Sequence, residues 1–207
     1  MSQIQTKHSE NRAVDISGLE AAVLLINGSP STTSKTGAVL GLIASHLKAE
    51  GITVKQVSVL DFEPEDLLFG NFQSESIRRF TEQISKAEVV VVGTPVYKAS
   101  YSGVLKTILD VISPGALAGK GVLALATAGS PSHFLILDYA LKPVLSFLGT
   151  RTFLGNIFLI DQDIRFDQGQ LVLDRDANER LKSAVAEILS RAKSNPKNLK
   201  TGGEISA

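Results

Sequence analysis

Five short apolar runs alternate with five amphipathic segments, and this alternation restricts the fold more than any other feature of the chain. Several of the apolar runs contain no polar residue, and the segments between them have helical character. Strand and helix in turn indicate a parallel sheet with helices on both faces. The expected strands are residues 22–27, 52–60, 88–93, 121–127 and 151–160, and the expected helices are 35–50, 74–87, 102–112, 133–149 and 176–193.

A sheet of five parallel strands suits a chain of 207 residues. Because crossover connections are right-handed, the alternation predicts an α/β fold, a three-layer α/β/α sandwich. We expect the flavodoxin-like strand order rather than the Rossmann order, since only five strands are evident. This single domain is expected at residues 21–193, between flexible polar tails at residues 1–20 and 194–207.

The composition limits the chemistry and the partners. The chain has no cysteine, which excludes disulfides, thiol redox chemistry and thiolate metal sites, so electron transfer would need a bound cofactor. The 21 basic and 21 acidic residues are scattered, which favours small molecules or proteins over nucleic acid as partners. No apolar run reaches the roughly 18 residues that span a bilayer, and residues 1–20 lack the apolar core of a signal peptide. We therefore expect a cytoplasmic protein without a membrane partner.

Three loops are candidates for function, because ligands of such sheets bind at the carboxyl ends of the strands. They follow the first, third and fourth expected strands, at residues 27–37, 93–103 and 127–133. All three are rich in glycine, proline and hydroxyl side chains.

The first loop, "NGSPSTTSKTG", leads from a strand into a helix, so backbone N–H groups and the positive helix end point at one place, which suits a phosphate. It is neither a Walker A sequence nor a G-x-G-x-x-G fingerprint, and it fits the monophosphate of FMN better than a triphosphate. The alternative is that its hydroxyls only form a turn and cap the helix. The candidate ligands are the hydroxyls of Ser29, Ser31, Thr32, Thr33, Ser34 and Thr36 and the ammonium group of Lys35.

The second loop, "GTPVYKASYSG", places a proline and a tyrosine directly after a buried strand, where a planar ring system can lie. Its candidate residues are Pro95, Val96, Tyr97 and Lys98. The backbone amides of Val96, Tyr97 and Lys98 would bond the polar edge of an isoalloxazine ring, and Lys98 would add positive charge nearby. The alternative is a structural turn in which Tyr97 and Tyr101 cover the core.

Several stretches resemble the NAD(P)H-dependent FMN reductases of the flavodoxin-like superfamily, in particular the reductase components of two-component alkanesulfonate monooxygenases. These are "INGSP", the hydroxyls of residues 31–36, "FEPEDLL", "TPVYKASYSGVLKTILD" and "DYALKPVLSFLG". The resemblance covers residues 22–165 and implies that the first loop binds the FMN phosphate and "PVYK" the ring system. It also implies that Thr127, Ala128, Gly129 and Ser130 meet the other edge of the ring.

One residue departs from the family pattern. Ser31 stands where the family often has arginine, which predicts a lower phosphate affinity or a larger role for Lys35.

The implied reaction is hydride transfer from NADPH, with NADH possible, to FMN, and it needs no side chain as acid or base. His133 follows the third loop and would equally cap a helix or contact a phosphate, so we assign no catalytic residue. The implied partner is a flavin-dependent monooxygenase that receives reduced FMN in sulfonate assimilation.

The expected helix at residues 133–149 has few polar positions, which indicates that it buries two faces. A subunit interface would supply the second face, and the alternative is a core helix kinked at Pro143. In the family this segment lies between subunits, and the tyrosine matching Tyr139 belongs to a π-helical bulge associated with flavin release. The resemblance therefore implies a homo-oligomer, either a dimer or a tetramer.

Two other functions remain open at this stage. One is a quinone or azo-dye reductase that retains its FMN, and the other is a non-enzymatic flavin-binding electron carrier. Flavodoxin-type carriers are usually strongly acidic, whereas the formal charge of this chain is +0, which weighs against a carrier.

Overall fold

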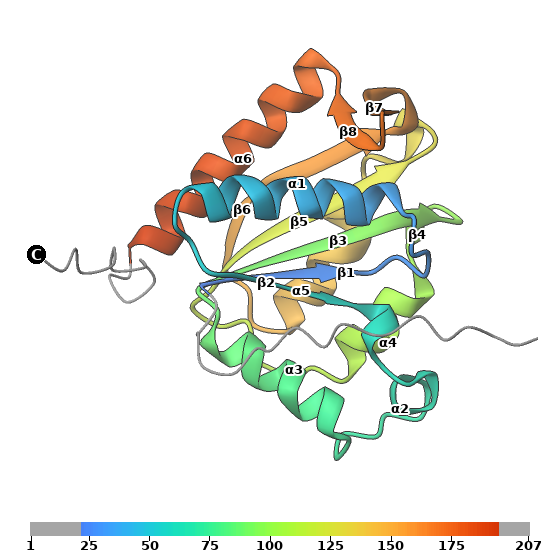
Figure 1. Cartoon of the computed structure of the whole chain (residues 1–207). Helices are drawn as coiled ribbons and strands as arrows, with labels where there is room; N and C mark the ends of the chain where they lie inside the picture. Colours follow the sequence, from blue (N-terminus) through green and yellow to red (C-terminus); the bar gives the residue numbers. More distant parts are fainter. Residues whose placement is uncertain (1–21, 195–207) are drawn as a thin grey trace, which may run out of the picture.

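The computed structural model describes residues 22–194, and its centre is a parallel sheet (Figure 1). The five main strands follow the order β2-β1-β3-β5-β6, which is the expected flavodoxin-like order. A short strand, β4 (Ser100–Tyr101), pairs antiparallel with β3 at the end of the sheet. The five parallel strands are β1 (Val23–Asn27), β2 (Val54–Ser58), β3 (Val89–Tyr97), β5 (Gly121–Ala128) and β6 (Thr152–Ile160).

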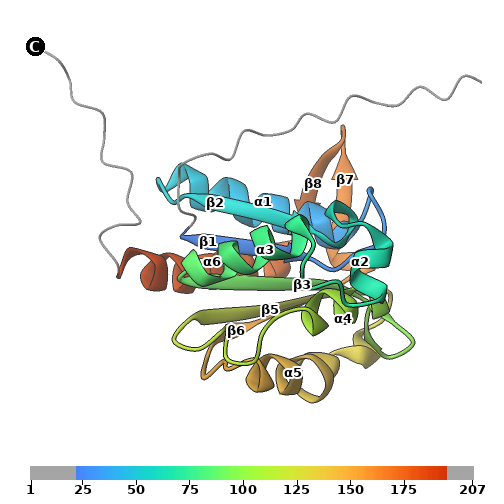
Figure 2. The same cartoon turned by 90° about the horizontal axis from the view of Figure 1, so that it is seen from below.

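Helices cover both faces of this sheet, as Figures 1 and 2 show. Helices α1 (Lys35–Ala49) and α6 (Arg175–Lys193) lie on one face. The other face carries α3 (Glu75–Lys86), α4 (Gly103–Asp110) and α5 (Lys142–Phe147). The expected three-layer sandwich is therefore confirmed.

Alternate residues of each strand supply the two cores between these layers. In β1, Leu25 packs toward α1 and α6, whereas its neighbours Leu24 and Ile26 pack toward α3 and α4. All three side chains are fully buried. A central parallel strand with both faces covered has to be apolar throughout, which explains the continuous apolar runs of the sequence.

The register of the strands brings the candidate loops together. Asn27, the last residue of β1, is level with Gly93 of β3, and Pro95 of β3 is level with Thr127 of β5. The loops that follow β1, β3 and β5 therefore leave the sheet side by side at its carboxyl edge.

The segment expected as one helix at residues 133–149 is not one regular helix. A 3₁₀ turn (Pro131–His133) precedes it, and a π-helix (Leu137–Leu141) leads into α5, near Pro143, which has no N–H to continue the regular ladder. Three elements were not expected from the sequence, namely α2 (Pro64–Leu68), β4 and a separate hairpin of β7 (Ile164–Asp167) and β8 (Gln170–Leu173).

The two expected tails lie outside the described residues, apart from Ser194. Between residues 22 and 194, no helix is long and apolar enough to cross a membrane.

Candidate functional site

The first loop is held in shape by its own side chains. The N–H of Ser29 donates to Oδ1 of Asn27 (3.1 Å), that of Ser31 to Oγ of Ser29 (3.2 Å), and that of Thr33 to Oγ of Ser31 (3.3 Å). Each side-chain oxygen thus accepts from the residue two positions further on, as in Asx and ST turns. The turn-forming role considered as the alternative is therefore real. Ser29 is only 1% exposed, whereas Ser31 is exposed and its hydroxyl also lies 3.4 Å from that of Thr33.

The first turn of α1 presents free donors to the space beside this loop. Ser34 is the N-cap, and its Oγ accepts from the N–H of Gly37 at 2.9 Å. The backbone N–H groups of Ser34, Lys35 and Thr36 donate to no partner within residues 22–194. Free N–H groups at a helix N-terminus form an anion-binding site, so this end of α1 fits a phosphate.

The side chains of Lys35 and Thr36 connect α1 to the neighbouring strand ends. Nζ of Lys35 lies 2.8 Å from Oδ1 of Asp161, which directly follows β6. The hydroxyl of Thr36 is buried and lies 2.7 Å from that of Thr127 in β5. The contact with Thr127 brings the first loop against the third one, and the contact with Asp161 ties it to the end of β6. Because the hydroxyl of Thr36 is engaged, its N–H rather than its hydroxyl is left for a phosphate.

The second loop is a tight hairpin between β3 and β4. Val96 pairs with Tyr101 and Tyr97 with Ser100, and the turn residues Lys98 and Ala99 have φ of 48° and 61°. A left-handed conformation in two residues other than glycine is strained, and such strain gathers at functional sites.

The two tyrosines of this loop have different surroundings. Tyr97 is 49% exposed near the tip of the hairpin, where its ring is available to a ligand. Tyr101 packs against the core, and burial raises the pKa of its hydroxyl. The alternative, in which these tyrosines only cover the core, therefore fits Tyr101 but not Tyr97.

Two residues that position the site were missed in the sequence analysis. Ser102 caps α4, its N–H donates to the hydroxyl of Thr94 (3.0 Å), and its own hydroxyl donates to the carbonyl of Gly28. A Cβ atom on Gly28 would lie 2.7 Å from Cβ of Leu105, so only glycine permits this approach. A serine before glycine and an apolar run is an N-cap signal, but the sequence does not reveal its contact with the first loop.

The third loop ends β5 and lies beside α1. Thr127 and Ala128 are buried, whereas Gly129 is exposed. Ser130 caps the following 3₁₀ turn, with its Oγ accepting from the N–H of Ser132 at 3.2 Å. His133 is half-buried at the end of this turn, and no described contact gives it a catalytic role.

The π-helix follows this loop and exposes Tyr139, whose residue surface is 79% accessible. The π-helical geometry implied by the family resemblance is thus confirmed. Asp138 fixes the segment by accepting from Nζ of Lys142 (2.6 Å) and Nδ2 of Asn156 (3.3 Å). The hydrogen bond from Lys142 lowers the pKa of the Asp138 carboxyl.

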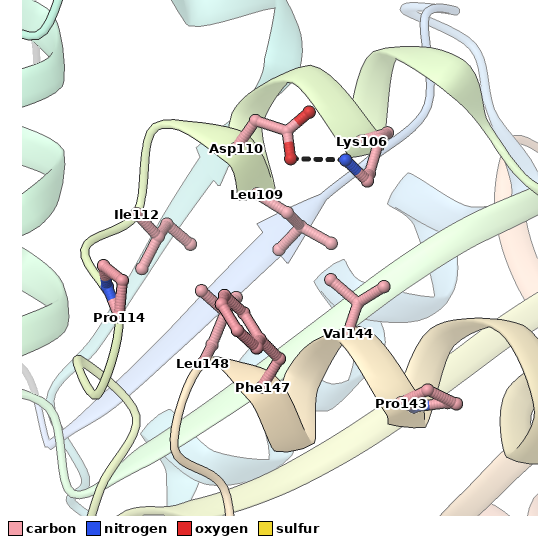
Figure 3. Close-up of a pocket in the computed structure, with 9 residues that line it drawn as sticks. All are labelled: Lys106, Leu109, Asp110, Ile112, Pro114, Pro143, Val144, Phe147 and Leu148. Atoms are coloured by element: carbon pink, nitrogen blue, oxygen red, sulfur yellow. Dashed lines mark hydrogen bonds and ion pairs between the residues drawn. The ribbon is translucent and has the colours of Figure 1, made fainter.

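A hollow with a volume of about 460 Å³ lies beyond the π-helix, between α4 and α5 (Figure 3). Pro143, Val144, Phe147 and Leu148 border it on the α5 side. The ring of Phe147 is 75% exposed there, so this apolar surface has no cover within the described chain.

Proteins with the flavodoxin-like fold bind FMN outside the carboxyl ends of the strands, at the switch point between the first and third strands, which is where the first two loops of this chain lie. The chain belongs to the NADPH-dependent FMN reductase family, whose sequence model matches residues 21–164. It is 44% identical over 147 residues to an FMN reductase (NADPH) of Pseudomonas putida, covering 71% of this chain and 75% of that protein. An Escherichia coli FMN reductase (NADPH) is 43% identical over 142 residues, covering 69% and 74% of the two chains.

A solved structure of an NADH:FMN oxidoreductase, EmoB in its apo form, is similar along most of its length. It superposes with a TM-score of 0.76 at 32% identity and covers 89% of this chain and 98% of the other.

Proposed function

We propose that this protein reduces FMN with a nicotinamide nucleotide and releases the reduced flavin to a separate monooxygenase, as part of sulfonate sulfur assimilation. The observation that carries the proposal is the group of free N–H donors of Ser34, Lys35 and Thr36 beside the loops that end β3 and β5. The relatives named FMN reductase (NADPH) support NADPH as the donor, and the similarity to an NADH:FMN oxidoreductase keeps NADH as the second choice.

The first loop holds the phosphate end of FMN. The N–H groups at the start of α1 and the exposed hydroxyl of Ser31 donate to it, Ser29 shapes the loop by accepting from the N–H of Ser31, and Lys35 adds positive charge. Because the loop is fixed by internal hydrogen bonds, little ordering is needed when the phosphate binds.

The second and third loops hold the ring system. Pro95, Val96, Tyr97 and Lys98 lie on one side, and the segment from Thr127 to Ser130 lies on the other. FMN, when bound, supplies the hydride-accepting chemistry. The residues of the protein orient the two ring systems and exclude water, and no side chain acts as an acid or base in this proposal.

Release of the flavin and assembly of the subunits both involve the segment with the π-helix and α5. Phe134, Tyr139 and Phe147 are 56%, 79% and 75% exposed, an unusual amount of aromatic surface for one short segment. We assign this face to contact with a second copy of the chain, in a dimer or a pair of dimers. Tyr139 would then lie at the junction of subunit interface and flavin site, where the π-helix favours release over retention.

Steady-state oxidation of NADPH tests this proposal, with free FMN as the sole acceptor and a quinone in a parallel assay. We expect turnover with micromolar FMN and a purified protein that is nearly colourless. A yellow protein that retains one FMN per chain and turns over only with the quinone would establish the quinone or azo-dye reductase instead. Bound FMN without NADPH oxidation would establish the electron carrier.

A further inference from the structure

Strand β6, the outermost strand next to β5, contains a bulge close to the π-helix. Phe153 of β6 is level with Val122 of β5. Three positions later along β6, Asn156 is level with Ala124, which is only two positions later along β5. Gly155 has a left-handed φ of 56°, as glycine often has in a bulge. The bulge therefore inserts one extra residue into β6, just before Asn156.

The extra residue decides which face of the sheet Asn156 occupies. Side chains of a regular strand alternate between the two faces, so residues four positions apart share a face. Phe153 packs against the core on the side of α5, whereas Ile157 packs against the core on the side of α1 and α6. The bulge has thus reversed the alternation. Asn156, directly before Ile157, therefore lies on the α5 side, where the π-helix is.

The amide of Asn156 contacts the π-helix directly. Its Nδ2 donates to Oδ1 of Asp138 at 3.3 Å, and the same oxygen accepts from Nζ of Lys142 at 2.6 Å. The ammonium group of Lys142 also lies 5.3 Å from the ring centroid of Phe153, which is within the range of cation–π contacts. One carboxylate of the π-helix is therefore bonded both to α5 and to the bulge of β6.

Of these two bonds, only the one to the sheet depends on π-helical geometry. The N–H of Lys142 donates to the carbonyl of Leu137, five positions back, rather than to that of Asp138 as in a regular α-helix. Because α5 is anchored by the fully buried Leu145, a change to α geometry would turn the residues before Lys142 about the helix axis. An Asp–Lys pair four positions apart also forms in a regular α-helix. Asn156 is fixed on β6, so the same turn would take Asp138 away from it.

We propose that Asn156 is a positioning residue for flavin release, because it holds Asp138 in the π-helical register and thereby fixes the exposed position of the next residue, Tyr139. The proposal rests on the proposed function, since it assumes that the π-helix favours release of FMN over retention. The selection of the register itself depends only on contacts within one chain.

Asn156→Asp tests this role, because a second carboxylate beside Asp138 replaces an attraction with a repulsion. The π-helix should then relax toward α geometry, so FMN should bind about threefold more tightly and kcat with free FMN should fall. An added negative charge alone would repel the phosphate of FMN, so tighter binding is the opposite of a general charge effect. Quenching of FMN fluorescence measures the affinity, and steady-state oxidation of NADPH measures kcat.

An exchange variant and a matched control complete the experiment. Combining Asp138→Asn with Asn156→Asp reverses donor and acceptor but keeps the hydrogen bond, and should restore the FMN affinity and kcat of the unmodified protein. The control Asn71→Asp breaks a similar exposed pair beyond α2, in which Nδ2 of Asn71 donates to Oδ1 of Asp66 at 2.7 Å. It should leave both values unchanged.

Unchanged or weaker FMN binding in Asn156→Asp would overturn the proposal, even if thermal stability falls, since the contact would then be only structural. A tightening that the exchange variant does not reverse, or that Asn71→Asp shares, would overturn it as well. If the unmodified protein reduces FMN and Asn156→Asp binds it as before, only the role of Asn156 fails. If no variant oxidises NADPH with FMN, but Asn156→Asp binds FMN more tightly and the exchange reverses this, the proposed function fails and the role of Asn156 stands.

Discussion

The first loop and the α5 face differ in whether one chain completes them. In the loop, side chains of Asn27, Ser29 and Ser31 satisfy backbone N–H groups in succession, and Ser102 ties the loop to α4. The α5 face, which we define as the π-helix, α5 and the hollow beside α4, leaves Tyr139 and Phe147 largely exposed. The polar region is therefore preorganised for a small ligand, whereas the apolar region needs another surface. We infer that the first loop determines how tightly FMN binds, and that the α5 face determines how readily it is released.

The largest effect is expected from a charge on the α5 face. Phe147→Asp should weaken self-association about a hundredfold, which corresponds to ~3 kcal/mol, because a carboxylate would be desolvated in the interface. The fold of the single chain should be unaffected, since Phe147 is 75% exposed. Sedimentation velocity over a range of concentrations measures the change.

Phe72→Asp is the matched control, since Phe72 is 58% exposed before α3 and away from the α5 face. If the assembly mass of Phe147→Asp is unchanged, or if both variants lose self-association equally, the α5 face is not a subunit interface. The contrast between the first loop and the α5 face would then not hold.

The contrast between the two regions also explains what the sequence could predict. The central strands β1, β3 and β5 were predicted because apolar runs buried on both faces leave a continuous signal. The β7–β8 hairpin was missed because its strands have four residues each and a turn of Gln168 and Gly169, which looks like an ordinary loop.

In the site, the sequence pattern of each loop predicted which side chains lie near the ligand, but not which of them contact one another. The hydroxyls of the first loop were expected to face the ligand, and their spacing of two residues is a local feature. The pairing of Thr36 with Thr127 joins residues 91 positions apart, and Lys35 with Asp161 is a similar case. Such contacts depend on strand order and register, which no short motif contains.

On the polar side, Ser34→Ala tests whether the cap prepares the phosphate site. Loss of the hydrogen bond to Gly37 should cost about 1 kcal/mol of stability and weaken FMN binding about fivefold, because the free N–H groups lose their fixed direction. Thermal unfolding and FMN titration measure the two effects.

Ser74→Ala removes an equivalent cap from α3, on the other face of the sheet, where Oγ of Ser74 accepts from the N–H of Ile77 at 3.3 Å. It should lower stability by a similar amount and leave FMN binding unchanged. If both variants bind FMN normally, the first loop is only a helix cap.

On the apolar side, a smaller effect is expected from Tyr139→Ala. Without this side chain the π-helix should relax toward regular α geometry, tighten FMN retention about threefold and lower turnover with free flavin. Since Tyr139 is 79% exposed, stability of the single chain should change by less than about 0.5 kcal/mol. Flavin absorbance after gel filtration, with the mass measured on the same sample, reports retention and assembly together.

Phe134→Ala trims an exposed ring just before the π-helix and should leave flavin retention unchanged. A colourless Tyr139→Ala protein that dissociates would mean that Tyr139 only packs between subunits.

The smallest effect concerns the charge beside the phosphate site. Nζ of Lys35 lies 2.8 Å from Asp161, and both side chains are partly exposed, so the pair is weak and competes with an incoming phosphate. Asp161→Asn should tighten FMN binding about twofold at low ionic strength, and salt should remove the gain because it screens the charge of Lys35. The control Glu179→Gln removes one acidic charge from another exposed pair, 2.9 Å from Lys182 on α6, and should bind FMN normally. Weaker FMN binding in Asp161→Asn would mean that Asp161 positions Lys35 for the phosphate, and the first loop would then depend on β6 rather than being complete in itself.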